Sequence, residues 1–114
     1  MTCMALIVAT PSLSGTLSPF FARAPWLLIV DADGGDALAV ENQGRTRSWM
    51  AAEIVRHGAD KVICGHAPPY ALRVLHRSGI DVRLGPCSVP VITLVADFET
   101  LPKPVAPQGD TSAP

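Results

Sequence analysis

The chain has 114 residues, of which 48% are hydrophobic and 17% charged, and its formal net charge is −1. This length supports one hydrophobic core but not two ordinary domains, and the composition is typical of a globular chain. The near-neutral charge gives no electrostatic reason to expect a nucleic-acid partner. The apolar run 4–9 is too short to span a membrane or to form a signal-peptide core, so we expect a cytoplasmic protein.

Three strands and a helix are predicted in the first half of the chain. The apolar runs 4–10 and 26–31 are typical of buried strands, and a loop rich in serine, threonine and proline separates them. An Asp-Gly-Gly-Asp turn at 33–36 then lets 37–41 pair back as a third strand. A helix is predicted over 46–57, because its apolar side chains recur at helical spacing.

Two similar units follow, each with a helix-ending glycine, a short apolar strand and a second glycine. Gly58 precedes a strand at 61–64, and after a helix over 69–78, Gly79 precedes a strand at 82–84. Glycine is the preferred residue just after a helix, where the backbone turns left-handed. Two such units in succession require right-handed crossovers, so these strands are predicted to be parallel to each other and to the first strand.

The last segment, 88–101, fits either a strand or a helix by its apolar spacing. Ser88 as N-cap and Pro90 in the first turn favour a helix. From 102 to 114 the chain is rich in proline and poor in large apolar side chains, which predicts a disordered tail. The folded domain is therefore expected to comprise 1–101.

The order β-β-β-α-β-α-β-α predicts a single α/β domain. Its simplest unknotted arrangement is a five-stranded mixed sheet in the order 3-2-1-4-5, with helices on both faces, as in ribonuclease-H-like folds. In open α/β sheets, ligands bind in the crevice at the carboxyl ends of the parallel strands. Functional side chains are therefore expected at that edge.

Cysteine and histidine side chains follow the two neighbouring parallel strands. Cys64, Gly65 and His66 end the first of these strands, and Cys87 and Ser88 follow the second. Thiolate and imidazole suit copper or iron, so Cys64, His66 and Cys87 are candidate metal ligands, with Gly65 and Ser88 as further contacts to a cofactor. Cys64 equally fits a core position, since cysteine is among the most buried residue types. Cys87 precedes a predicted helix whose N–H groups would favour its thiolate.

Arginine side chains flank the predicted crevice. Arg23 lies just before the second strand, and its planar guanidinium suits electrostatic capture of an anion, with a solvated surface charge as the alternative. Arg45 and Arg47 begin a predicted helix, where positive charge opposes the helix dipole unless an anion is near. Cys3, by contrast, lies at the opposite edge of the sheet and is expected to take no part.

Two segments of the chain resemble motifs of a known family. Residues 18–31, SPFFARAPWLLIVD, resemble its pattern S-P-H-F-G-R-A-P-x-F-x-I-V-D, and residues 58–66, GADKVICGH, match G-x-D-x-V-I-C-G-H. Residues 69–82 continue its helix–glycine–strand pattern. On these motifs the chain is similar to the dinitrogenase iron–molybdenum cofactor-binding family, which includes NifX- and NafY-like carriers, the C-terminal part of NifB and the molybdenum–copper orange protein. Phe20 and Ala22 stand where the family has its favoured ligand, histidine, and a glycine.

The resemblance implies a cofactor carrier, not an enzyme. Its cargo would be an anionic metal–sulfur cluster of the iron–molybdenum or molybdenum–copper type, with a partner protein in cluster assembly or transfer. A thiomolybdate-like unit brings its own sulfur and needs mainly positive charge and N–H donors, which accommodates Phe20. A metal-free regulatory or protein-interaction module of the same fold is the alternative. A third hypothesis is thiol chemistry at Cys87, which the lack of a Cys-x-x-Cys pair disfavours.

Overall fold

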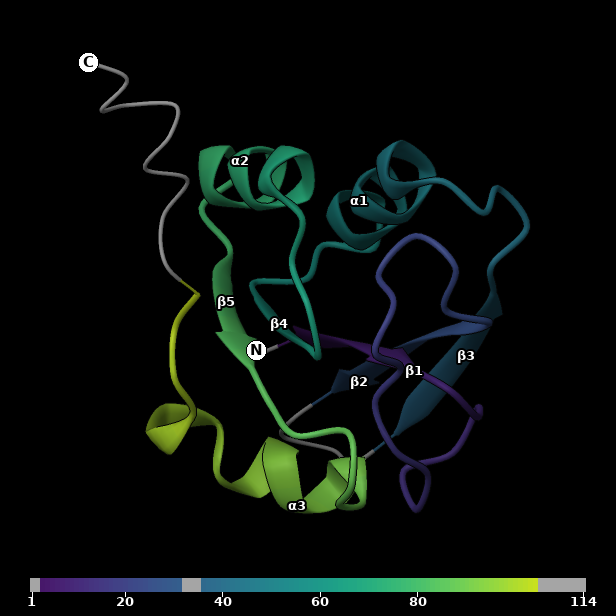
Figure 1. The fold of residues 1–114 in the computed structure, drawn as a ribbon, viewed down its shortest axis with the longest axis vertical. Coiled ribbons are helices and arrows are strands. Elements are labelled where there is room, and N and C mark those ends of the chain that lie inside the picture. The colour runs from purple at the N-terminus through teal and green to yellow at the C-terminus, as the bar shows by residue number, and fades with distance from the viewer. Residues whose placement is uncertain (1–2, 32–35, 105–114) are drawn as a thin grey trace.

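The computed structural model describes residues 3–31 and 36–104, and within them the chain forms one mixed sheet covered by helices (Figure 1). Most of the hairpin turn predicted at 33–36 and most of the tail predicted at 102–114 lie outside the described residues. None of the helices within the described ranges is long and apolar enough to cross a membrane. The elements are β1 (Cys3–Val8), β2 (Trp26–Asp31), β3 (Ala37–Glu41), α1 (Arg47–Arg56), β4 (Lys61–Cys64), α2 (Pro69–Arg77), β5 (Asp81–Leu84), α3 (Val91–Ala96) and a 3₁₀ turn, η1 (Phe98–Thr100).

The strand order is β3-β2-β1-β4-β5, as predicted. β1, β2 and β3 form an antiparallel meander, whereas β4 pairs in parallel with both β1 and β5. Gly58 and Gly79, which follow α1 and α2, have φ of 74° and 77°, the left-handed conformation that glycine adopts without strain. The parallel pairing brings the carboxyl ends of β1, β4 and β5 to one edge of the sheet.

β1 lies at the centre of the sheet and is buried on both faces, whereas the edge strand β3 is largely exposed. Alternate residues of β1 point to opposite faces, so Ala5 and Ile7 join the core under α1 and α2, while Leu6 and Val8 join the core under α3. A central strand buried on both sides needs apolar residues throughout, which explains the unbroken apolar run in the sequence. The helices therefore cover both faces, as predicted (Figure 1).

The C-terminal helix begins later than predicted, so the assignment of Ser88 as its N-cap is wrong. Ser88 lies in a turn, and Pro90 is the N-cap, without a side-chain cap hydrogen bond. The first two helical amides, of Val91 and Ile92, donate instead to the carbonyl oxygens of Gly15 and Leu13, at 2.8 and 3.0 Å. Contacts with a distant loop therefore fix the start of α3.

The buried Arg83 of the edge strand β5 forms hydrogen bonds to the segment after α3. The Arg83 guanidinium donates to the carbonyl oxygens of Phe98 and Leu101 at 2.9 and 3.1 Å and pairs with Asp81 at 2.9 Å. Its Cζ lies 4.6 Å from the centroid of the Phe98 ring. The amide of Leu84 donates to the carbonyl oxygen of Pro102, so chain contacts continue along β5 up to that residue.

Candidate functional site

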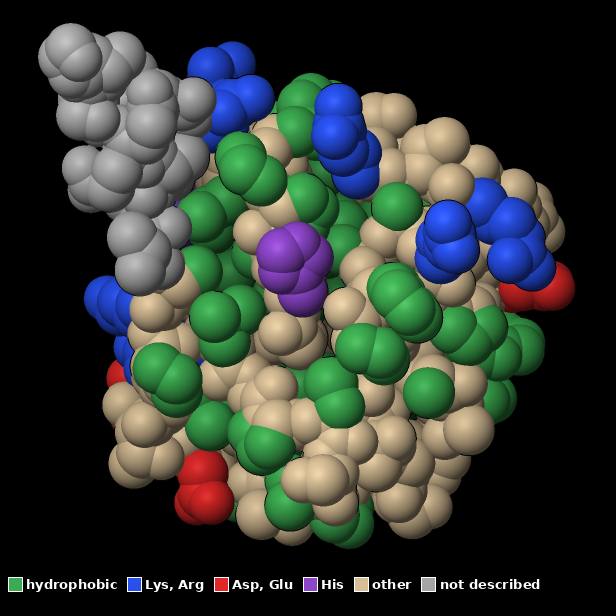
Figure 2. All heavy atoms as spheres, in the orientation of Figure 1, with side chains coloured by type: hydrophobic (Ala, Val, Ile, Leu, Met, Phe, Trp, Pro, Cys, Tyr) green, Lys and Arg blue, Asp and Glu red, His purple; other side chains and the backbone are tan. Residues whose placement is uncertain are grey.

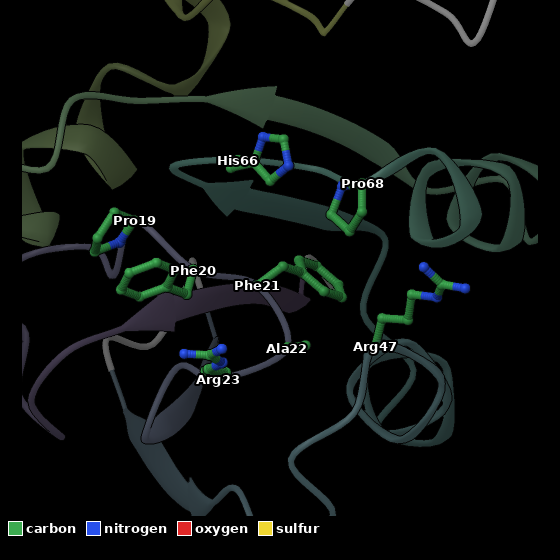
Figure 3. A pocket seen from close by; sticks show the side chains of 8 residues that line it. All are labelled: Pro19, Phe20, Phe21, Ala22, Arg23, Arg47, His66 and Pro68. Carbon is green, nitrogen blue, oxygen red and sulfur yellow. The ribbon is translucent and has the colours of Figure 1, made fainter.

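A pocket of about 320 Å³ opens where the loop between β1 and β2 meets the loop after β4. Figure 3 shows its lining: the Phe20 and Phe21 rings lie between Arg23 and His66, and Arg47, at the start of α1, lies at the border with its guanidinium directed away from the two rings. Phe20 is 57% exposed, whereas Phe21 is buried in the core. The remaining lining residues are Pro19, Ala22 and Pro68.

The charged side chains that line the pocket are all basic. The Arg23 Cζ lies 6.0 Å from the centroid of the Phe20 ring, and the Arg47 Cζ lies 5.3 Å from that of Tyr70. Within the described residues, neither arginine pairs with a carboxylate. Asp31, Asp60 and Asp81 lie at the other edge of the sheet, as their pairing with β1 and β4 shows. The lining of the pocket is therefore favourable to an anion.

One face of the molecule shows the same distribution (Figure 2). In the orientation of Figure 1, hydrophobic side chains surround an exposed histidine, Lys and Arg side chains gather along the upper and right parts of the face, and Asp and Glu side chains lie near its rim. An apolar surface bordered by cations is the kind of surface expected for a ligand that is both anionic and weakly hydrated.

The loops after β4 and β5 meet closely at Gly65. A Cβ atom on Gly65 would lie 2.6 Å from the Cys87 Sγ and 2.9 Å from the carbonyl oxygen of Ser18. The amide of Gly85 also donates to the carbonyl oxygen of Cys64 at 3.1 Å. Only glycine allows this approach, so the sequence places Gly65 where three segments converge.

Cys64 belongs to the core, not to the pocket. It is fully buried among the residues under α1 and α2, and desolvation raises the pKa of its thiol to about 12, although the His66 backbone N–H acts in the opposite direction. The Cys64 thiol is therefore not exposed to the pocket that His66 lines. No group of three or more His, Cys, Asp or Glu side chains in residues 3–31 and 36–104 is placed to hold a metal ion.

The other candidates occupy different positions relative to the pocket. Arg23 and His66 line it, whereas Cys87 is exposed on the adjoining loop and Ser88 follows it in the same turn. Cys3 lies at the amino end of β1, its Sγ 3.7 Å from the carbonyl oxygen of His57, far from this edge. The sequence prediction did not include Pro68 or Arg47 in the site. The signal for Arg47 was its positive charge at the start of a helix, which opposes the helix dipole unless an anion is near.

The three thiols are expected to react with a maleimide in the order Cys87, then Cys3, then Cys64. Cys87 is exposed. Burial and the nearby carboxylates of Asp60 and Asp31 raise the pKa of the Cys3 thiol, and Cys64 has no access to solvent. The first two amides of α3 are already bonded, so exposure accounts for the reactivity of Cys87. Pulsed labelling followed by peptide mass spectrometry measures the order. Native labelling of Cys64 as fast as Cys87 would contradict its placement in the core.

The fold and the pocket define a class: a small α/β domain with a five-stranded mixed sheet and a pocket lined by apolar and basic side chains at the carboxyl edge of its parallel strands. Within that class, the chain belongs to the dinitrogenase iron-molybdenum cofactor family, whose model matches residues 4–100. The resemblance carried by the two sequence motifs is thereby confirmed.

Solved structures agree with this assignment. The apo form of the orange protein from Desulfovibrio gigas is 25% identical, with a TM-score of 0.83 over 93% of this chain and 95% of that one. A Thermotoga protein described as a putative NifB protein is 24% identical, with a TM-score of 0.69 over 88% of each chain. The protein PH0822 is 19% identical, with a TM-score of 0.73 over 93% and 97%. The last two support the fold alone. Comparison with curated protein sequences gives no significant match.

Proposed function

We propose that the protein is a cytoplasmic carrier that binds an anionic, molybdenum-containing metal–sulfur cluster and delivers it to a partner protein. Membership of the iron–molybdenum cofactor family and the likeness to the orange protein support this function. The observation that carries it is the pocket itself, in which Arg23 and Arg47 flank an apolar floor without an acidic side chain among its described lining residues.

The chemistry of the lining favours a sulfide-rich anion over an oxyanion. Oxyanions are held mainly by backbone N–H donors, often at a helix N-terminus. Here Pro68 is the N-cap of α2 and Pro69 its first residue, and neither has an N–H to donate. Pro19 removes another donor, and Phe20 presents an apolar ring in its place. With these N–H donors missing, the guanidinium groups are left to balance the charge of the ligand, and the apolar rings suit a large, polarisable sulfide surface better than a small, strongly hydrated oxyanion.

Each candidate residue has a proposed role. Arg23 and Arg47 supply charge, and the exposed imidazole of His66 is the metal ligand within the pocket. The Cys87 Sγ packs close to Gly65, so a cluster longer than the pocket would extend toward Cys87 and its neighbour Ser88. Cys64 holds the core beneath them. We thus place metal coordination at His66 and Cys87 rather than at all three predicted ligands.

Anaerobic reconstitution tests the proposal. Protein incubated with tetrathiomolybdate and a copper salt, then desalted, is expected to retain a visible chromophore and both metals, whereas molybdate should be lost on desalting. The complex should weaken as salt is added, because charge contributes to binding. Bound cluster should also slow the labelling of Cys87, and equal labelling with and without cluster would remove Cys87 from the site.

A cation outside the pocket should not matter for this binding. Arg77→Ala removes an exposed cation from the end of α2 far from the pocket and should leave binding unchanged. If no metal survives desalting, the carrier function is wrong. The metal-free interaction module then becomes the better hypothesis, favoured by the exposed Phe20 ring at the centre of the site.

A further inference from the structure

A single buried amide side chain joins the two segments that carry the pocket arginines. Asn42, which is only 2% exposed, follows β3 and precedes the turn into α1. Its Nδ2 donates to the carbonyl oxygens of Ala22 and Ala24, at 2.9 and 2.7 Å, on either side of Arg23. Its Oδ1 accepts from the amide of Arg45 at 2.8 Å. Both donors and the acceptor of one side chain are thus used on two separate segments.

These contacts specify asparagine at this position. Two carbonyl oxygens face the Nδ2 and one N–H faces the Oδ1, so only one orientation of the amide satisfies all three groups. The backbone amide of Asn42 also donates to the carbonyl oxygen of Pro25, which anchors the residue itself. Aspartate would have the same shape but would place a carboxylate oxygen against the two carbonyls.

The segment on the α1 side carries backbone strain. Arg45 has a φ of 54°, a left-handed conformation that residues other than glycine rarely adopt. Its amide donates to the Asn42 side chain, and Arg47, two residues later, lines the pocket. Strained conformations persist only where surrounding contacts determine them. Here the hydrogen bond to Asn42 is such a contact, and it sets the path of the chain from β3 to Arg47.

We propose that Asn42 is a positioning residue of the pocket, which holds the Arg23 loop and the Arg47 turn at the fixed separation that anion binding requires. The inference rests on the proposed function and adds to it a residue that does not touch the ligand. Its physical basis is that a binding site loses affinity when its charged groups must be ordered at the moment of binding.

Two readouts test the role of Asn42. With tetrathiomolybdate and copper as the probe, Asn42→Ala should raise the dissociation constant about tenfold. In a protein that already carries Arg23→Ala, the same substitution should raise it by less than about threefold, because the effects of coupled residues on the binding free energy do not add. In the ligand-free protein, NMR order parameters of backbone amides in 20–24 and 45–47 should fall together. If Asn42→Ala does not fold, Asn42→Ser, which retains one donor, replaces it.

Arg83→Lys is the matched control, because it weakens another buried polar junction at a distance from the pocket. It should lower the unfolding midpoint while leaving both the dissociation constant and the order parameters of 20–24 unchanged. Wild-type affinity in Asn42→Ala, full additivity with Arg23→Ala, or unchanged order parameters in both segments would each overturn the inference. Failure of the wild-type protein to bind would overturn the proposed function instead, and the order parameters would still decide the role of Asn42.

Discussion

Replacing Arg23 and Arg47 together with alanine is expected to weaken binding of the thiomolybdate–copper cluster about 100-fold or more, since removing one charge-assisted hydrogen bond lowers affinity by a factor of about ten or greater. Both guanidinium groups line the pocket, and within the described residues neither pairs with a carboxylate, so each is available to the ligand. Titration of the visible chromophore under anaerobic conditions, at several salt concentrations, measures the change in affinity.

The salt dependence is the decisive part of this measurement. The double variant should show a weaker decrease of affinity with salt than the wild-type protein, because fewer charges take part in binding. A charge-matched control, Arg56→Ala with Arg77→Ala, removes two cations near the C-terminal ends of α1 and α2 and should change affinity little. Equal decreases in affinity in the two double variants would show that overall charge, and not this pocket, governs binding.

Alkaline pH is expected to destabilise the protein through Cys64. The pKa of this buried thiol is about 12 in the folded state, against 9.0 for the ordinary thiol of the unfolded chain. Between pH 9 and pH 12 the Cys64 thiol loses its proton in the unfolded chain but keeps it in the folded protein. Its contribution to the free energy of unfolding is therefore fully present below pH 9 and is lost as the pH rises toward 12. The free energy of unfolding should fall by about 2 kcal/mol between pH 9 and 11 from this group alone.

Comparison of variants isolates that contribution. Urea unfolding at several pH values should show a shallower decline for Cys64→Ala than for the wild-type protein, whereas Cys87→Ala, which alters an exposed thiol, should follow the wild-type slope. Parallel slopes for all three proteins would mean that Cys64 is not held neutral in the core. The placement of Cys64 outside the ligand site would then need revision.

The fold was predictable because its signals are local. The paired glycines around β4 and β5, the apolar run of β1 and the helical spacing in α1 each lie within a short window and agree with one another. The start of α3 was not predictable, since it depends on carbonyl groups of a loop more than 70 residues earlier in the chain, an arrangement that helix-capping preferences do not encode.

The site was predictable only in part, for a related reason. The carboxyl edge and the lining positions of Arg23 and His66 follow from topology and motif. That the Cys64 thiol is buried while the Cys87 thiol is exposed depends on which face each side chain takes after its strand, which spacing alone leaves open. The role of Asn42 was not predictable, because the two carbonyl groups that its side chain joins to the α1 segment lie 20 and 18 residues away, and asparagine often simply ends a strand.

The central position of β1 has a consequence for synthesis on the ribosome. β1 precedes the other strands of the sheet in sequence, and it pairs on one side with β2 and on the other with β4. The backbone amide of Cys3, at the start of β1, donates to the Asp60 side chain just before β4, and these two residues are 57 positions apart. The β1–β2–β3 meander can assemble early, but one edge of β1 stays open until β4 has left the exit tunnel. Bringing β1 and β4 together closes the long stretch of chain between them, and this step should limit the folding rate. A nascent chain that ends before β4 should depend on chaperones to keep the open edge of β1 from aggregating.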